Sequence, residues 1–505
     1  MSKHKKITRR NHKQTNRKRI SHKRTNRKPI ADYKQLTIKG GSPEEDSMTP
    51  TDFSVAKPVV ATNKPLNELH IEELSSKMEN PMENLGKMLS VVCKDPDNCL
   101  ALGAYIPMMK RFFNDFRDLS LVDIKSLNRL GSPSSNGFVF EIPFKKNEYT
   151  SYTVLKSAAK PKADNLFYEY YVGKTFINKY LQQFPVFVET YDCYRYNSHL
   201  LASTFKQIAE NKIKIPNTGI TDLNTVITRI DHGDLTSVSE MNRMFEDSCS
   251  EPDTICILIQ HFNNLTPFKN IFDETSPNYQ TNKLDGPYLF YQLYFALSVI
   301  GDKYTHYDLH AENVNVYKPY SGQKYILMRY HSNGKVHEFP SEYIVKIIDY
   351  GRNYINNGTT TTNEIVSNII CNTPKCNPNC GDQVGYRAIQ GDYGDYNDYY
   401  NINPIVPNAS HDLRVFANLN DVRQPDLWKG RIYKDELYYE GKYGTPEDLT
   451  GDVDHIRSIH DLRAALEKTA FPNYNDSMTK KYEGWEQAAI MDVYDDGRDY
   501  EFKVI

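Results

Sequence analysis

Two short polar motifs, each placed shortly after an apolar segment, constrain the fold of this 505-residue chain more than any other feature. The first runs from His306 to Asn313 after the apolar segment 288–300, and it places Asp308 five residues before the amide of Asn313. On one short loop this spacing lets the carboxylate orient a hydroxyl group while the amide oxygen reaches a metal ion. The second motif places Asp349 at the end of an apolar strand, where its oxygens suit Mg²⁺. Together the motifs predict a site built from oxygen ligands.

A turn of small residues and a strand lysine upstream have the chemistry that phosphate groups need. The turn connects two predicted strands and would let backbone N–H groups approach phosphate oxygens. Lys156 ends the strand-like segment 152–156, one strand after the segment 138–142, and Glu169 lies on the helix predicted over about 165–181, within reach of an ion pair with Lys156. An ordinary hairpin loop and two solvent-exposed charges explain the same residues when each is taken alone. The candidate phosphate-binding residues of the turn are Gly131, Ser132, Ser134 and Gly137.

The order of these features resembles the protein kinase superfamily. A glycine-rich turn, a strand lysine, a helix glutamate, a His-x-Asp-Leu-x-x-x-Asn loop and an Asp-aromatic-Gly motif follow one another over roughly residues 120–420. The form of the loop at 306–310, together with the abundance of Asn and Tyr, looks most like the protein kinases of giant DNA viruses of the mimivirus type. The resemblance implies an α+β, two-lobed kinase-like fold with a small antiparallel β-rich lobe, a larger helical lobe and insertions.

The resemblance also implies ATP and Mg²⁺ as cofactors and gives each motif residue a role. Lys156 would contact the α- and β-phosphates, and Glu169 would hold Lys156 in place. Asp308 would be the catalytic base, while Asn313 and Asp349 would bind magnesium. The residues that would cover the nucleotide are Gly131, Ser132, Ser134 and Gly137, and those that would form the hinge beside adenine are Gln260, His261 and Phe262.

Four positions near the catalytic motif refine this interpretation. His306 is interpreted as a buried histidine that supports the loop, and Asp412 resembles the aspartate that braces it from a central helix. Tyr307 stands where many regulated kinases have Arg, so we do not expect control by activation-loop phosphorylation. His310 replaces a lysine and is expected to donate to the γ-phosphate. Because aminoglycoside and choline kinases share this histidine, it favours a small-molecule substrate.

The sequence therefore leaves three functions open. The first is a Ser/Thr protein kinase, and the alternatives are a small-molecule phosphotransferase of the aminoglycoside or choline kinase type and a pseudokinase that acts as a binding scaffold. Asp308 and Asp349 are 41 residues apart, and residues 325–339 between them are typical of an inserted hairpin with an Asn-Gly turn. No Ala-Pro-Glu follows Asp349, so no substrate-docking segment is recognisable.

Positive charge is concentrated in an N-terminal tail. Residues 1–34 contain 14 Lys or Arg and one acidic residue, Asp32, in a nearly duplicated sequence without an apolar face. We expect disorder there, and either a nuclear address, a packaging signal or contact with nucleic acid or another polyanion. The predicted organisation is a tail and linker (1–62), a helical extension (63–119), a small lobe with an insertion at about 197–252 (120–262), and a large lobe with a C-terminal extension (263–505).

The eight cysteines are too dilute for a disulfide scaffold and predict thiols in a reducing compartment. No apolar segment is long enough to cross a bilayer, and the basic N-terminus lacks the apolar core of a secretory signal. We therefore expect an intracellular protein of a host cytoplasm or nucleus, or of a virion. Three cysteines lie close together, namely Cys371, Cys376 and Cys380. A zinc site there would need a fourth ligand such as His411, and free thiols or an oxidised pair are the favoured alternative.

Overall fold

The computed structural model describes residues 81–131, 137–158, 165–233, 235, 237–358, 365–372, 376, 407–419, 456 and 458–505. The predicted tail and linker lie outside the described residues, as do Ser132 and Ser134 of the small-residue turn and Cys380. The described part combines several sheets with helices and confirms the predicted α+β class.

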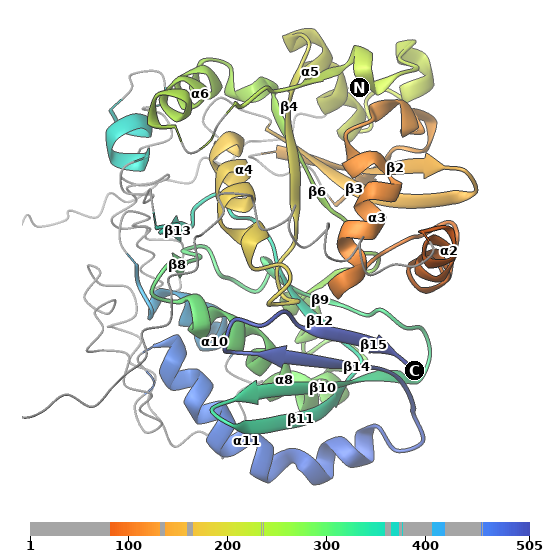
Figure 1. The fold of residues 1–505 in the computed structure, drawn as a ribbon. Coiled ribbons are helices and arrows are strands. Elements are labelled where there is room, and N and C mark those ends of the chain that lie inside the picture. The colour runs from red at the N-terminus through yellow and green to blue at the C-terminus, as the bar shows by residue number, and fades with distance from the viewer. Residues whose placement is uncertain are drawn as a thin grey trace, which may run out of the picture. The chain divides into compact units, whose positions relative to one another are not determined.

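The largest sheet has six antiparallel strands in the order β1-β2-β3-β6-β4-β5 (Figure 1). The strands are β1 Asn128–Leu130, β2 Gly137–Lys146, β3 Tyr149–Ala158, β4 Thr190–Tyr196, β5 Ile227–Arg229 and β6 Ile255–Gln260. Because successive side chains of a strand point to opposite faces, β6 contributes to two apolar cores. Ile255 and Ile257 belong to one core, and Cys256 and Leu258 belong to the other.

Strand β3 carries Lys156 in the interior of this sheet. Lys156 is paired with Val139 on β2 and with Ile257 on β6. Paired residues of neighbouring strands share a face, so the Lys156 side chain lies on the face that carries Ile257. Helix α4, Leu166–Thr175, packs on β4 and β6, and its apolar residues share a core with Ile257 (Figure 1).

Local sequence explains where α4 begins and why it is buried. The Asn165 side chain accepts hydrogen bonds from Phe167 N (3.0 Å) and Tyr168 N (3.3 Å), which is the usual way an asparagine caps a helix. Residues 166–173 are all buried, as expected of a helix that is apolar on every side. At Gly173 a Cβ atom would lie 2.1 Å from Thr190 Oγ1, so only glycine permits this approach to β4. The helix predicted over 165–181 ends at Thr175, and a 3-10 turn follows it.

Helices from two parts of the chain cover the remaining surfaces of the sheet. Helices α2 (Pro81–Val92), α3 (Ile106–Phe112) and α5 (His199–Ala209) contribute to the second core, which holds the Cys256 side of β6. Helix α6, Val238–Ser250, instead packs near α4 (Figure 1). Residues 197–252, which the sequence interprets as an insertion, therefore form α5, β5 and α6 between strands β4 and β6.

The second half of the described chain is built around helix α8, Tyr279–Ile300, which is buried along most of its length. Two small sheets lie in this half. One consists of β7 (Thr266–Pro267), β9 (Val314–Tyr317) and β12 (Ile344–Ile347), and the other of β8 (Tyr304–Thr305) and β13 (Tyr354–Ile355). The short helices are α7 (Phe268–Ile271) and α10 (Arg414–Asn418).

The predicted hairpin is present, and the end of the chain extends it. Strands β10 (Lys324–Ser332) and β11 (Lys335–Ser341) are joined through Asn333 and Gly334, whose φ angles of 50° and 76° suit a tight hairpin turn. Strand β14, Glu486–Tyr494, pairs with β10 in parallel, and β15, Glu501–Val504, pairs with β14. Helix α11, Ile459–Lys481, packs against α8 (Figure 1).

The cysteines correct in part the prediction that thiols are the default state, because Cys193 and Cys256 are free thiols but other described cysteines form disulfides. Cys93 is bonded to Cys99, and Cys249 is bonded to Cys376. Cys371 is also disulfide-bonded, so neither Cys371 nor Cys376 offers a thiolate, and the zinc hypothesis is wrong for these two residues. Sequence spacing could not reveal the Cys249–Cys376 bond, because the partner of Cys376 lies in helix α6, 127 residues away. Among the described helices, none combines the length and apolarity that a membrane crossing requires.

Candidate active site

Two carboxylates meet at Lys156, one from the next helix and one from a distant part of the chain. Lys156 Nζ lies 2.7 Å from Glu169 Oε2 and 2.9 Å from Asp349 Oδ1. Lys156 comes from β3, Glu169 from the first turn of α4, and Asp349 from the segment after β12. A lysine has three N–H donors, so two described contacts leave one for a further acceptor.

The charges of this cluster stabilise one another. Burial by itself would lower the pKa of Lys156, but the carboxylates of Asp349 and Glu169 outweigh burial and raise the pKa well above its ordinary value. Burial would raise the pKa of Asp349, but the ammonium group of Lys156 outweighs it and lowers the pKa from 3.8 to about 2. Both groups are therefore charged at neutral pH, and a permanent cation lies beside a permanent anion.

Asp349 is held in an unusual backbone conformation. Its φ angle is 70°, which residues with a side chain seldom adopt. The next residue, Tyr350, fixes the segment, because its hydroxyl accepts from Val188 N at 2.9 Å and lies 3.0 Å from Ile347 O, to which it can donate. Left-handed backbone of this kind is concentrated at functional sites, where the surrounding structure enforces it.

The antiparallel pairing of β9 with β12 brings the two predicted motifs together. Asn313 immediately precedes β9 and Asp349 follows shortly after β12, and the pair Val314–Ile347 places both at one end of the two strands. Ile348 N donates to Asn313 O at 3.0 Å. The Asn313 Nδ2 atom donates to Asp308 O at 2.9 Å, which leaves Oδ1 as the atom suited to a cation.

Asp308 lies between two basic side chains. Its Oδ1 atom is 3.7 Å from His310 Nε2 and 3.6 Å from Arg414 Nη1. Burial lowers the pKa of His310, although the Asp308 carboxylate opposes this effect. Sequence reasoning missed Arg414, which lies in α10 and whose only signal was its place two residues after Asp412.

Asp412 and His306 hold the loop that carries Asp308. The buried Asp412 carboxylate accepts from His306 N at 2.7 Å and from Tyr307 N at 3.1 Å, while Tyr307 has φ 60°. His306 Nδ1 accepts from Asp308 N at 3.2 Å, so Nε2 carries the proton and donates to Ile348 O at 3.0 Å. His306 thus connects the Asp308 loop with the strand that leads to Asp349.

The residues predicted to form the hinge use their side chains for internal contacts. Gln260 Oε1 accepts from Glu189 N at 3.3 Å. His261 Nε2 lies 2.9 Å from Glu141 Oε2. The buried Phe262 ring packs in the core, and its centroid lies 4.1 Å from the Nζ atom of Lys346. Burial lowers the pKa of Lys346 to about 7. Each of these three side chains therefore already has a contact inside the protein.

The small-residue turn connects β1 and β2, and only its two ends are described. Gly131 has φ 64°, and a Cβ there would meet no atom within 4 Å. Gly137 is different, because a Cβ would lie 2.5 Å from Ser157 O on β3. Close pairing of β2 with β3 therefore requires glycine at this position.

The described residues hold no cluster of three or more His, Cys, Asp or Glu that would by itself bind a metal. Asp349 and Asn313 nevertheless offer one carboxylate and one amide oxygen at one end of the paired strands β9 and β12. This donor set fits Mg²⁺, which binds few protein oxygens and completes its shell with phosphate oxygens and water. The cation of Lys156 beside it fits a polyphosphate.

Neither a protein-family model nor a curated protein matches the sequence. One solved structure that the fold resembles is described as WaaP in complex with acyl carrier protein. The similarity covers 52% of this chain and 74% of that chain, with 7% sequence identity and a TM-score of 0.23. A TM-score this low assigns neither a fold nor an activity.

Proposed function

We propose that this protein is an ATP- and Mg²⁺-dependent phosphotransferase with a kinase-like, two-lobed arrangement. One observation carries the proposal: Lys156 bonds at the same time to Glu169 of a buried helix and to Asp349 at the end of a strand. A surface lysine would have neither partner in this way. The Asp308 loop is tied to the same strand end through His306, so a base, a cation and metal ligands share one site.

The residues divide the chemistry among them. Lys156, oriented by Glu169, binds phosphate oxygens of the nucleotide through its remaining N–H donor. Asp349 and Asn313 hold Mg²⁺, which when bound neutralises charge on the transferred phosphoryl group. Asp308 orients the acceptor hydroxyl and takes its proton. Most of the rate enhancement then comes from positioning and charge neutralisation.

The acceptor that we propose is a Ser or Thr hydroxyl of a protein, as in the giant-virus protein kinases that the sequence resembles. A small-molecule acceptor is the second candidate, and the position of His310 favours it. His310 Nε2 lies 3.7 Å from Asp308 Oδ1, in the place of the lysine of protein kinases. A pseudokinase that binds a partner without turnover is the third.

The test is transfer of labelled γ-phosphate from Mg·ATP to a mixture of proteins and, separately, to small alcohols and aminosugars. We expect labelled protein from the wild type and a loss of at least about 100-fold in Asp308→Asn. Asp302→Asn, at an exposed position on the same stretch of chain, is the matched control and keeps full transfer. Label only in small molecules supports the second candidate. Thermal stabilisation by Mg·ATP without transfer supports the scaffold, and equal transfer by wild type and Asp308→Asn contradicts the assigned base.

The basic tail, residues 1–34, lies outside the described residues, and its contact with nucleic acid or another polyanion stays a prediction. Fourteen Lys or Arg in this segment would release counterions from a polyanion on binding. Deletion of the segment should therefore weaken binding to duplex DNA and flatten the dependence of that binding on salt. Unchanged binding and salt dependence would rule the tail out. Its place in a host cytoplasm, nucleus or virion is likewise a prediction.

A further inference from the structure

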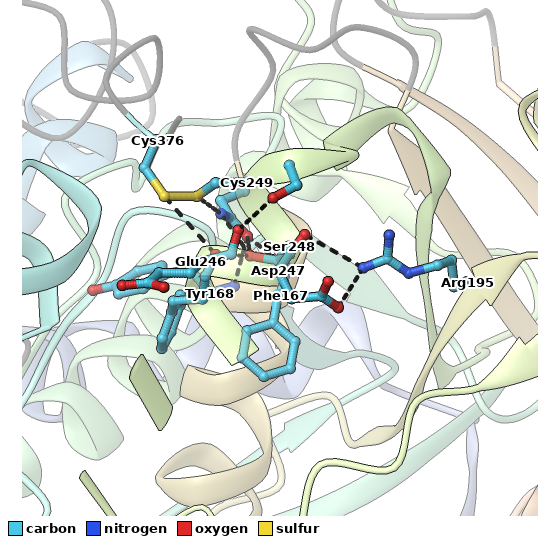
Figure 2. Close-up of a disulfide and its surroundings, with 11 residues drawn as sticks. Phe167, Tyr168, Arg195, Glu246, Asp247, Ser248, Cys249 and Cys376 are labelled. Carbon is cyan, nitrogen blue, oxygen red and sulfur yellow. Dashed lines mark hydrogen bonds and ion pairs between the residues drawn. A yellow bond between two sulfur atoms is a disulfide. The ribbon is translucent and has the colours of Figure 1, made fainter. Parts of the chain in front are cut away.

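The disulfide between Cys249 and Cys376 connects two segments that sequence order keeps far apart. Cys249 lies near the end of α6, and Cys376 lies after the Asp349 motif, 127 residues beyond its partner (Figure 2). Both sulfur-bearing residues are buried, with exposed fractions of 5% and 0%. The bond therefore joins the inserted helix α6 covalently to the chain that follows Asp349.

A single side chain connects this disulfide with the start of α4. Asn165 Nδ2 donates to Cys249 Sγ at 3.3 Å and to Ser248 Oγ at 3.2 Å. The Oδ1 atom of the same side chain accepts from the first-turn amides of Phe167 and Tyr168. Glu169, the partner of Lys156, is the next residue of that turn. The Asn165 amide group is thus one link between α6 and the turn that carries Glu169.

Aromatic packing and ion pairs complete the support of α6. The Phe245 ring of α6 meets the Phe167 ring edge-on, with centroids 5.0 Å apart. On the other side, Arg195 of β4 lies 2.9 Å from Asp247 (Figure 2). Arg195 also lies 2.9 Å from Glu251. These carboxylates are 59% and 49% exposed, and exposed ion pairs contribute little. The covalent disulfide is therefore a stronger attachment of α6 than these ion pairs.

We propose that the Cys249–Cys376 disulfide is a positioning device for Glu169, so that phosphoryl transfer requires the oxidised pair. Through Asn165 the disulfide keeps the first turn of α4 where Glu169 meets Lys156. This inference rests on the proposed phosphotransfer. A dithiol reductant reverses the device: two electrons and two protons pass to the two sulfurs, the S–S bond breaks, two thiols form, and the dithiol becomes a disulfide.

The first experiment uses two double variants. One carries Cys249→Ser and Cys376→Ser and lacks the disulfide of the proposal. The matched control carries Cys93→Ser and Cys99→Ser and lacks the disulfide nearer the N-terminus. Hydrogen exchange reports on the first-turn amides of α4, and kinetics give kcat and the KM for ATP. In the first variant we expect protection of these amides to fall about tenfold, the effect typical of a lost helix cap, with a similar loss of kcat/KM. The control should stay within about twofold of the wild type on both measures.

A second variant keeps the inference testable when the cysteine variant does not fold. Asn165→Asp retains an oxygen that caps α4 but loses the Nδ2 donor that reaches Cys249. In Asn165→Asp, reduction by a dithiol should cause no further loss of α4 protection or of kcat/KM. In the wild type, reduction should lower α4 protection and kcat/KM as much as the Cys249→Ser and Cys376→Ser substitutions do. Mass spectrometry of the thiols verifies reduction in both.

The outcomes separate the two proposals. If the oxidised wild type transfers phosphate to none of the acceptors, the phosphotransfer proposal is wrong. Hydrogen exchange then still decides whether the disulfide positions α4. Unchanged exchange at the first turn of α4 after removal or reduction of the Cys249–Cys376 bond overturns the inference. The inference is also overturned if the Cys93–Cys99 control loses as much α4 protection and kcat/KM as the Cys249–Cys376 variant. A further loss on reduction of Asn165→Asp, as large as that in the wild type, overturns it as well.

Discussion

Replacement of Lys156 by Met tests the centre of the site without any assumption about a substrate. Methionine keeps much of the length of lysine but removes the charge that Glu169 and Asp349 share. Glu169 is buried, so it would lose its cation in a place that water reaches poorly. The substitution should therefore lower the free energy of unfolding as well as abolish phosphotransfer.

The structure sets the size of this effect. The pKa of Asp349 falls from 3.8 to about 2 in the folded protein, which corresponds to roughly 2 kcal/mol of stability at pH 7. Removing one partner of a buried ion pair costs about 3–5 kcal/mol, and the exposed fractions of 23% for Lys156 and 32% for Asp349 reduce that figure. We expect Lys156→Met to lose about 3 kcal/mol at pH 7.

The pH dependence gives a second, independent measure. A carboxylate whose pKa is lowered on folding contributes stability above its unfolded pKa and loses it as the pH falls through the folded value. For Asp349 this window runs from pH 3.8 down to about 2, with about half of the contribution remaining near pH 3. In Lys156→Met, Asp349 no longer has the cation that lowers its pKa. The part of the acid-induced loss of stability that Asp349 causes in the wild type should therefore be absent from this variant.

Urea unfolding at pH 7 and at steps down to about pH 2.5 measures both quantities. Lys145→Met is the matched control, because Lys145 lies on the neighbouring strand β2 and pairs with Asp123 at 2.8 Å, with exposed fractions of 50% and 29%. Its loss should not exceed about 1 kcal/mol. Equal losses in the two variants, or an acid limb of Lys156→Met that matches the wild type, would refute the reasoning.

Three further predictions concern the supports of the site. Asp412→Asn should lower the free energy of unfolding by about 2 kcal/mol, because the two backbone N–H groups donate to different carboxylate oxygens and an amide has only one oxygen. Urea unfolding measures the loss, and an unchanged midpoint would contradict this prediction. Loss of the Cys249–Cys376 disulfide, which closes a separation of 127 residues, should lower the free energy of unfolding by about 5 kcal/mol through chain entropy. Loss of the Cys93–Cys99 disulfide, with a separation of 6, should lower it by only about 2 kcal/mol, and equal losses would refute this ranking. Arg414→Gln should reduce kcat about tenfold with little change in the KM for ATP, because the guanidinium lies 3.6 Å from Asp308; a change in KM alone would place Arg414 elsewhere in the reaction.

Local patterns in the sequence predicted much of the described fold. The alternating segments at 138–142 and 152–156 lie within β2 and β3, and the Asn-Gly pair marks the turn of the β10–β11 hairpin. These patterns work because strand periodicity and turn conformation depend on a few neighbouring residues. The limits of α4 were less accessible. Its predicted extension to residue 181 is wrong, because the backbone leaves the helical conformation at Phe176, where φ is −121°, and a 3-10 turn follows.

The candidate site shows the same division. The sequence alone determined which residue types are available: a strand lysine, a helix glutamate, and two acidic motifs that each follow an apolar segment. Only the tertiary structure decided that Lys156 has two carboxylate partners, that Arg414 lies beside Asp308, that β14 joins β10 in parallel, and that Cys249 meets Cys376. The physical reason is that each of these contacts joins segments far apart in the chain, and its formation depends on how whole elements pack, which no local pattern records.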